Sequence, residues 1–384
     1  MNLPVITLAD FDPQAFLRDT WQKKPLLVRS AFAGWSNPVE PDELAGLACE
    51  SGIESRLVHG AEGALSVEHG PLAAERFDAL GTSAWTLLVQ AVDHHVPEVA
   101  GLLDAFRFVP NWRIDDVMVS YATDGGGVGA HYDQYDVFLI QGLGRRRWEL
   151  GDMCNDETPL LPHEDLRLLA QFTARQDFVL EPGDMLYVPP GLAHRGTAIG
   201  HDCMTYSVGF RAPSQGELVE GWTDAVLDTL AEDDRYADPD LTLQDNPGEI
   251  TKAALGRLHA AAIAKLDDRQ AFALWFGRLA TAPKNDLIDW QPEDPADARQ
   301  VAALLADGAA ILRNPASRFA FIRTGEDEVH LYVDGEGVRC TGHAARFAAE
   351  LCASPRLENV QANAEVTQLL VTLCNRGCVA FEED

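Results

Sequence analysis

The chain has 384 residues and a formal net charge of −30 at pH 7, from 60 acidic residues and 30 lysine or arginine residues. A surface this acidic repels phosphate backbones, which argues against direct binding of nucleic acid and favours a basic protein as the partner. The sequence contains neither a signal peptide nor an apolar run near the roughly 20 residues of a membrane span, so we expect a cytoplasmic protein with no membrane contact.

Residues 1–212 contain short β-rich runs that alternate with glycine and proline turns, a texture typical of a β-sandwich or barrel. The runs are PLLVRSAF, DDVMVSYA, DVFLIQG, RRRWELG, DFVLEPGDMLYVPP and MTYSVGF. Helices are expected beside them, around residues 12–22 and 40–50.

From residue 213 the pattern becomes helical. Apolar residues recur at three- and four-residue steps through 218–230 and 250–263, and a third apolar face follows over 272–279. Helices this apolar need a surface to pack against. We predict that residues 213–280 form the dimerisation segment of a homodimer, with the barrel wall as the alternative surface.

Residues 281–384 combine helices with small strands. Helices are predicted over 345–351 and 364–373, a hairpin within DEVHLYVDGEGVRC, and a last strand in GCVAFEED. This combination resembles a winged helix, a shape often used on DNA. Acidic residues outnumber basic ones in this part of the chain, so we expect a protein-facing or packing domain instead.

The segment His131-Tyr132-Asp133 is the first of two candidate metal-binding motifs. On a strand, residues two apart point to the same face, so the imidazole and the carboxylate would both project into a barrel. A single His-x-Asp is common, but this one follows the glycine-rich run Gly125-Gly126-Gly127-Val128-Gly129, and a strand is expected directly after it.

The second motif is GDMLYVPPGLAH, which ends at His194. Its spacing resembles the second motif of the cupin superfamily, and the spacing from Gly125 to His131 fits the first. Asp133 stands where many cupins have a second histidine. Two histidines and one carboxylate form the facial triad of non-haem Fe(II) oxygenases. The alternative is three polar residues satisfied within a core.

A facial triad leaves open coordination positions for a 2-oxo acid and O2, and a 2-oxo dicarboxylate also needs a cation for its far carboxylate. The run Gly144-Arg145-Arg146-Arg147-Trp148 offers guanidinium groups, which bind carboxylates in a bidentate manner. Strand alternation pairs Arg146 with Trp148 and Arg145 with Arg147, without deciding which face lines the pocket. Alternatively, all three arginines are solvated or pair with the acidic surface.

Five segments carry a wider resemblance that extends over the whole chain. The chain resembles the JmjC-type 2-oxoglutarate oxygenases and, within them, the bacterial ribosomal oxygenases. The segments are KKPLLVR (23–29), WRIDDVMVSYA (112–122), GGGVGAHYDQYDVFLIQG (125–142), GRRRWEL (144–150) and PGDMLYVPPGLAHRG (182–196).

The resemblance implies an α+β chain: a double-stranded β-helix (the cupin/JmjC jelly roll) over 1–212, the helical dimerisation segment and a winged-helix-like domain over 281–384. It implies Fe(II) on His131, Asp133 and His194, with Arg146 on the C5 carboxylate of 2-oxoglutarate. The implied reaction uses O2 to hydroxylate an arginine of large-subunit ribosomal protein sixteen, a basic partner, and releases succinate and CO2.

The substrate side of the pocket follows from alternation along 116–122, where Asp116, Met118 and Ser120 share one face. We expect Asp116 to pair with a guanidinium and Met118 to pack along its aliphatic stem. The alternative for Asp116 is a turn or cap residue. Ser207 is a candidate hydrogen-bond donor to 2-oxoglutarate, and His94 is expected at the surface.

Three other functions remain open from the sequence. A histidine hydroxylase or a lysine demethylase would use the same iron core, although no aromatic cage for a methylammonium is evident. A metal-binding cupin without oxygenase activity, such as an isomerase, would not need the oxo acid.

Overall fold

The structure is a computed structural model that describes residues 8–61, 64–81, 83–285 and 287–382. The chain forms two compact units. The first joins Met1–Ala212 with Pro283–Arg318 and Ser354–Asp384, and the second joins Pro213–Ala282 with Phe319–Ala353. None of the helices in the described residues is long and apolar enough to cross a membrane.

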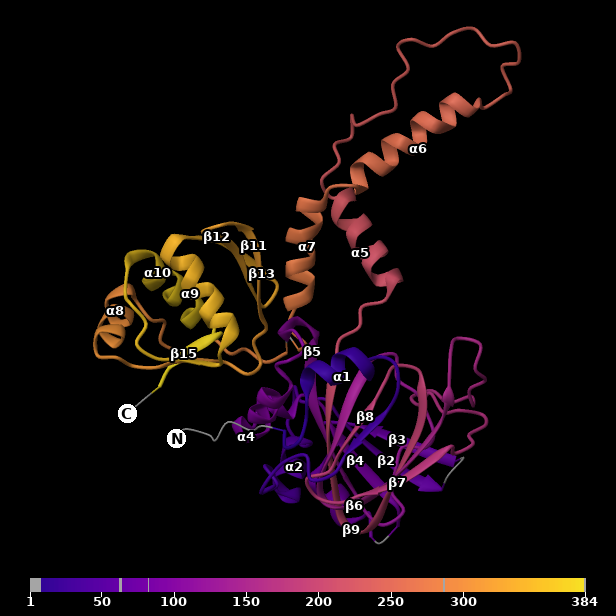
Figure 1. Ribbon diagram of the computed structural model, residues 1–384, viewed down its shortest axis with the longest axis vertical. Helices are drawn as coiled ribbons and strands as arrows, with labels where there is room; N and C mark the ends of the chain where they lie inside the picture. Colours follow the sequence, from indigo (N-terminus) through magenta and orange to yellow (C-terminus); the bar gives the residue numbers. More distant parts are fainter. Residues whose placement is uncertain (1–7, 62–63, 82, 286, 383–384) are drawn as a thin grey trace. The chain divides into compact units, whose positions relative to one another are not determined.

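The first unit is built around a nine-stranded antiparallel sheet that winds into a jelly roll (Figure 1). Its strands follow one another in the order β1-β8-β6-β9-β5-β4-β2-β3, with β7 on β6. The bounds are β1 Leu26–Val28, β2 Ser55–Ala61, β3 Ala64–His69, β4 Trp85–Val89, β5 Ile114–Ala122, β6 Asp136–Met153, β7 Gln176–Leu180, β8 Met185–Val188 and β9 Leu192–Phe210. The double-stranded β-helix expected from the sequence is confirmed. Strands β2 to β4 were not among the predicted runs.

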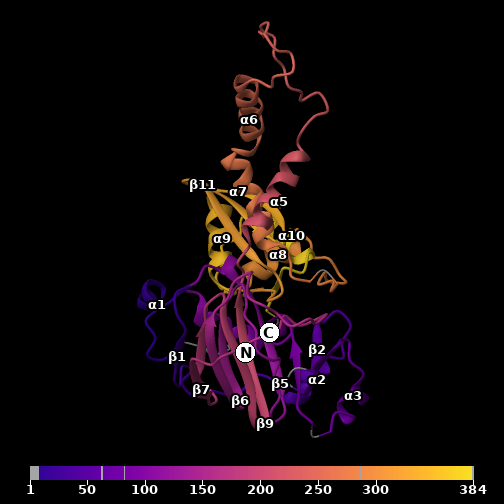
Figure 2. The ribbon, with the colours of Figure 1, turned by 90° about the vertical axis from the view of Figure 1, so that its right-hand side faces the viewer.

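Strands β6 and β9 run side by side through both halves of the jelly roll (Figure 2). The runs DVFLIQG and RRRWELG, predicted as separate strands, form the single strand β6, whose two halves both pair with β9. Register shifts on either side of Leu143 bend the pair. Gly144 lies there at φ +59°, and a Cβ on it would come within 2.7 Å of the Asp202 carbonyl oxygen. The glycine therefore marks a bulge, where the chain bends without ending its ladder.

Strand alternation gives β6 two buried faces. Phe138 belongs to the outer core, where its ring lies 4.8 Å from that of Phe106 and 5.0 Å from that of Tyr187, centroid to centroid. Val137 and Leu139 point the other way, toward the interior of the jelly roll. Truncating an aromatic ring in such a core costs about 3–5 kcal/mol, so the outer core holds in place the strands that carry the site.

Short helices cover the outer face of the sheet. The first begins at Pro13, where the carboxylate of Asp12 caps the backbone N–H groups of Gln14 and Ala15, and it buries Phe16 in the outer core. The helices here are α1 Pro13–Asp19, α2 Pro41–Leu47, α3 Ala74–Asp78 and α4 Pro97–Ala100. The helices expected around 12–22 and 40–50 correspond to α1 and α2.

The remainder of the first unit comes from the C-terminal part of the chain. A three-stranded sheet in the order β14-β10-β15 lies with two helices that pack on each other. These elements are α8 Ala298–Ala306, β10 Ile311–Arg313, β14 Arg356–Leu357, α10 Ala364–Asn375 and β15 Val379–Phe381. The second predicted helix and the last strand are thereby confirmed.

The described residues of the second unit form four helices and a β-meander. Its elements are α5 Gln215–Leu227, α6 Lys252–Leu266, α7 Arg269–Thr281, β11 Phe319–Gly325, β12 Glu328–Val333, β13 Glu336–Thr341 and α9 Gly342–Ala353. Trp222 of α5 packs against Phe272 and Trp275 of α7, at 5.4 and 5.7 Å between ring centroids. Helix α6 has no buried residue, and its apolar side chains, such as Leu255 and Ile263, are exposed.

Candidate metal centre

His131 and His194 face each other across an isolated antiparallel bridge. The N–H of His131 donates to the carbonyl of His194 at 3.0 Å, and the N–H of His194 donates back at 2.8 Å. Asp133 follows in an irregular segment, where its carbonyl accepts from the N–H of Gly191 at 2.7 Å. The expected regular strand through residues 131–133 is therefore wrong, but pairing with the start of β9 still brings the three side chains together.

The three side chains form a compact set of metal-ligand atoms. One ligand atom from each of His131, Asp133 and His194 lies within 4.8 Å of the others. Each imidazole is oriented by its Nδ1, which lies 3.0 Å from a backbone carbonyl, that of Gly129 for His131 and that of Leu192 for His194. This leaves both Nε2 atoms available, and a hydrogen bond at the other ring nitrogen is the usual way in which a metal-binding histidine is oriented.

The protonation state of His194 suits a metal ligand. Burial, followed by the neighbouring His131, lowers the pKa of His194 to about 4, although Asp133 opposes the shift. The imidazole is therefore neutral at pH 7, and neutral imidazole is the form that coordinates metal ions. The donor set of two nitrogens and one carboxylate is the one expected for non-haem Fe(II).

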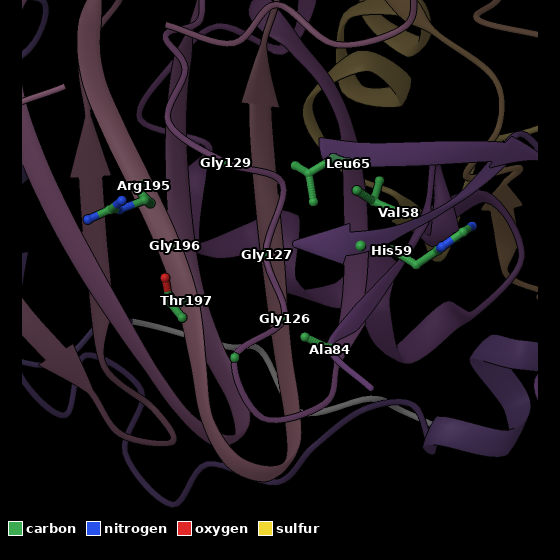
Figure 3. Close-up of a pocket in the computed structure, with 12 residues that line it drawn as sticks. Val58, His59, Leu65, Ala84, Gly126, Gly127, Gly129, Arg195, Gly196 and Thr197 are labelled. Atoms are coloured by element: carbon green, nitrogen blue, oxygen red, sulfur yellow. The ribbon is translucent and has the colours of Figure 1, made fainter. Parts of the chain in front are cut away.

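The glycine-rich run allows the two histidine-bearing segments to approach. A Cβ at Gly127 would lie 2.4 Å from the carbonyl oxygen of Gly196, a distance that no side chain tolerates. Figure 3 shows this crossing, where the two segments and the β2–β3 hairpin enclose a small pocket of about 100 Å³. The absence of a side chain at residue 127 therefore permits the backbone bridge between the two ligands.

All three candidate ligands line a larger pocket of about 520 Å³ inside the jelly roll. Its wall includes one face of β5, where Asp116, Met118 and Ser120 alternate as predicted. Met118 lies opposite Ser207 of β9 in the ladder, and Ser120 lies opposite Thr205. The pocket thus collects every residue proposed from the sequence as a ligand or binding residue. Residues lining it that the sequence analysis did not propose include Thr86 and Thr205.

Arg146 is the buried cation of this pocket. It is 4% exposed and its guanidinium lies 5.8 Å from the centroid of the Trp148 ring, whereas Arg145 and Arg147 are exposed. Its Nε and Nη2 have no hydrogen-bond partner among the described residues. A buried guanidinium without an acceptor is costly. The arrangement therefore fits a carboxylate ligand and decides which face of the arginine run lines the pocket.

The buried hydroxyl of Thr86 and the indole N–H of Trp148 also lack partners among the described residues. Both line the pocket that contains Arg146. Trp148 was identified by alternation. Thr86 lies on β4, a strand that the sequence analysis did not name, so no local signal pointed to it.

Comparisons with known proteins agree with this geometry. Residues 101–218 match the family model described as the JmjC domain, and residues 264–380 match the one described as a ROXA-like winged helix. The ribosomal protein uL16 3-hydroxylase of Escherichia coli (strain K12) is 41% identical over 323 residues, 84% of each chain. A probable ribosomal oxygenase of Haemophilus influenzae is 32% identical over 84% of this chain and 81% of that protein.

Solved structures of similar sequence contain ligands of the expected chemistry. The E. coli ribosomal oxygenase YcfD with cobalt and succinic acid matches with a TM-score of 0.86, over 98% of this chain and 100% of that chain. Its complex with cobalt and 2-oxoglutarate matches with a TM-score of 0.87 over the same shares, and both are 36% identical to this chain. The expected jelly roll and winged helix are confirmed.

Proposed function

This chain belongs to the ribosomal oxygenases, a family of JmjC-type 2-oxoglutarate oxygenases, and we propose that it hydroxylates an arginine side chain of ribosomal protein uL16. The E. coli relative is named as a 3-hydroxylase of ribosomal protein uL16. The observation that carries the proposal is the buried guanidinium of Arg146, which lies in the same pocket as the two histidines and the aspartate. Two of its nitrogens have no hydrogen-bond partner in the part of the chain that the structure describes.

His131, Asp133 and His194 would hold Fe(II), since their donor atoms converge and both Nε2 atoms are available. When bound, the iron would couple oxidative decarboxylation of 2-oxoglutarate by O2, giving succinate and CO2, to insertion of one oxygen atom into a substrate C–H bond. The rest of the pocket binds and orients the two organic reactants. Hydroxylation at one carbon requires that a single C–H bond be held beside the metal.

Arg146 is the proposed partner of the C5 carboxylate of 2-oxoglutarate. Its fork of N–H groups matches a carboxylate in a bidentate manner. The Trp148 ring lies beside the guanidinium, 5.8 Å from ring centroid to Cζ. Ser207 lines the same pocket on β9 and is proposed as an additional hydrogen-bond donor to the oxo acid. Burial of these groups excludes water, which strengthens their interaction with a dicarboxylate.

The substrate arginine is proposed to lie along β5. Asp116 is a β5 residue and not a turn or cap residue, and its buried carboxylate lines the pocket beside Met118. A carboxylate next to a flexible apolar side chain suits a guanidinium on its aliphatic stem. The net charge of −30 would raise the encounter rate with a basic ribosomal protein.

We also propose that the chain forms a homodimer through residues 213–280 and acts in the cytoplasm without binding nucleic acid directly. Exposed apolar side chains on α5 and α6, among them Val219, Leu227 and Leu255, support a second copy as the covering surface. The division at residues 212 and 280 remains a proposal. Light scattering on the purified chain should give twice the mass of 41.9 kDa, and a monomer would contradict it.

The proposed activity is tested by incubating the protein in air with Fe(II), 2-oxoglutarate and unmodified E. coli uL16, followed by peptide mass mapping. We expect one added oxygen on an arginine-containing peptide, with one succinate formed for each. The same oxygen on a histidine would instead favour a histidine hydroxylase, and loss of a methyl group from lysine would favour a demethylase. No change, from protein shown to contain iron, would overturn the assignment.

A further inference from the structure

A cluster of charged side chains lies at the Asp116 end of the pocket. The ammonium of Lys284 is 2.8 Å from Oδ2 of Asp115 and 2.9 Å from Oδ1 of Asp116. Arg318 lies 2.7 Å from the other oxygen of Asp115 and also donates to its backbone carbonyl. Lys284 and both aspartates line the same pocket as the candidate metal ligands.

Burial makes this cluster sensitive to its charge balance. The side chain of Lys284 is 23% exposed and that of Asp116 is 6% exposed. Burial opposes the charge of Lys284, but Asp116 and Asp115 together raise its pKa above the usual value, so it stays protonated. Burial raises the pKa of Asp116, and Lys284 opposes that rise. The ammonium therefore favours the ionised form of Asp116 against the effect of burial.

The titratable neighbours beneath the cluster add no charge at neutral pH. Burial, and then Asp116, raise the pKa of Asp93 from 3.8 to about 8. His94, expected at the surface, is instead 7% exposed, and burial followed by Arg318 lowers its pKa to about 4. Both side chains are therefore neutral at pH 7. The ion pairs of the cluster thus join two carboxyl groups, Asp115 and Asp116, to two cations, Lys284 and Arg318.

A further cation that joined this cluster without displacing Lys284 would bring three cations to two carboxyl groups, and an unpaired buried charge is costly. Lys284 makes point contacts with its ammonium, whereas a guanidinium can bind a carboxylate in a bidentate manner. We infer that Lys284 stands in for the cationic side chain of the substrate. The ammonium of Lys284 pairs with Asp115 and Asp116 in the substrate-free protein and is displaced from them when the substrate arginine enters.

This role makes Lys284 a specificity-determining residue, and it rests on the proposed hydroxylation of an arginine. A neutral side chain cannot replace the ammonium, so it would leave the carboxylates unpaired. Occupation by Lys284 also weakens binding of the correct substrate. If it fills the subsite about nine-tenths of the time, the apparent Kd for substrate is raised about tenfold.

The test is a cycle of two enzymes and two substrates, with Kd measured by calorimetry in the presence of Fe(II) and 2-oxoglutarate but without O2. The enzymes are the native chain and Lys284→Met. The substrates are E. coli uL16 and the same protein with its mapped target arginine replaced by glutamine. We expect Lys284→Met to bind native uL16 about tenfold more tightly and to show no such gain for the glutamine substrate.

Two further variants serve as controls. Lys265→Met removes a lysine that pairs with Asp234 outside the pocket, at 3.4 Å, and should leave both Kd values unchanged. Lys284→Arg keeps a cation on the carboxylates and should not reproduce the gain. Thermal melting of every variant checks the fold. If Lys284→Met does not fold, a structure of the native complex replaces it, and Lys284 should lie beyond ion-pair distance of Asp116, roughly 4 Å.

Equal changes in Kd for the two substrates, or weaker binding of native uL16, would make Lys284 a structural partner of Asp116 and overturn the inference. So would a complex in which the Lys284–Asp116 contact is kept. These outcomes leave the proposed function intact as long as the native enzyme adds oxygen to uL16. If it adds none, both proposals fail, and that result is obtained separately by mass mapping.

Discussion

The two ends of the main pocket contain buried groups of opposite charge, which differ in whether another side chain pairs with them. At one end the guanidinium of Arg146 is buried, and two of its nitrogens have no hydrogen-bond partner among the described residues. At the other end the carboxylate of Asp116 is equally buried but is paired with Lys284. A charged group without an internal partner can bind its ligand directly. A charged group already in an ion pair binds a ligand only when the ligand displaces the internal partner.

The candidate metal ligands lie in the pocket that both ends share, and removing one should have the largest effect. His131→Ala deletes one of three donors, so we expect iron content and succinate formation to fall by more than about 100-fold. Iron is measured by mass spectrometry and succinate by chromatography. The exposed His201 offers a matched control, because His201→Ala should retain both. Full iron occupancy in His131→Ala would contradict the assigned donor set.

Substitution at the Arg146 end should selectively weaken the binding of 2-oxoglutarate. Arg146→Met removes the proposed carboxylate partner, and we expect the apparent KM for 2-oxoglutarate to rise about 100-fold. The variant also removes a buried guanidinium with two nitrogens that lack a partner among the described residues, so its melting temperature without ligand should exceed that of the native chain.

The exposed neighbour Arg145 provides the control, since Arg145→Met should change neither the KM nor the melting temperature. A lower melting temperature for Arg146→Met would show that the native guanidinium is satisfied without ligand. The contrast between the two ends of the pocket would then disappear.

Substitution at the Asp116 end should instead weaken the binding of the protein substrate. In the native chain the N–H of Ala91 donates to the carboxylate of Asp116 at 2.8 Å. Asp116→Asn keeps an oxygen for this N–H but removes the charge. We expect the Kd for uL16 to rise about tenfold, with the KM for 2-oxoglutarate unchanged. Asp177→Asn, at an exposed ion pair with Arg147, is the control. A changed KM for 2-oxoglutarate would mean that the two ends are not separate subsites.

The smallest expected effect concerns stability and pH at the buried Asp93. Its pKa rises from 3.8 to about 8 on folding, through burial and then Asp116, so the folded state keeps a proton that the unfolded state loses. Stability is therefore lost as pH rises between these two values. Asp93→Asn cannot lose a proton, and its oxygen still accepts from the N–H of Val117.

The melting temperature of the native chain should thus fall relative to that of Asp93→Asn as the pH is raised from about 5 to about 8. Parallel melting curves for the two proteins across that range would show that Asp93 is ionised in the folded state. The cluster around Lys284 would then hold one more negative charge than the ion pairs described above contain.

The candidate ligand set could be proposed from the sequence because its signals are local. The spacing of the motifs around His131 and His194 pointed to the triad, and alternation placed Arg146 with Trp148 and Asp116 with Met118. Two local expectations about strands were wrong. The segment through Asp133 is irregular, and DVFLIQG and RRRWELG form one strand. Glycine permits both a turn and a bulge, so the residue type alone does not distinguish them.

By itself the sequence determined the jelly roll, the candidate metal ligands and the class of chemistry, since these depend on spacing and on periods of a few residues. Only the tertiary structure decided which arginine is buried, and only it brought Lys284 to Asp115, a residue 169 positions away. The physical reason is that ion pairs and desolvation depend on which segments pack together. The residue pattern along β5 does not indicate that Lys284, far away in the sequence, pairs with its carboxylates.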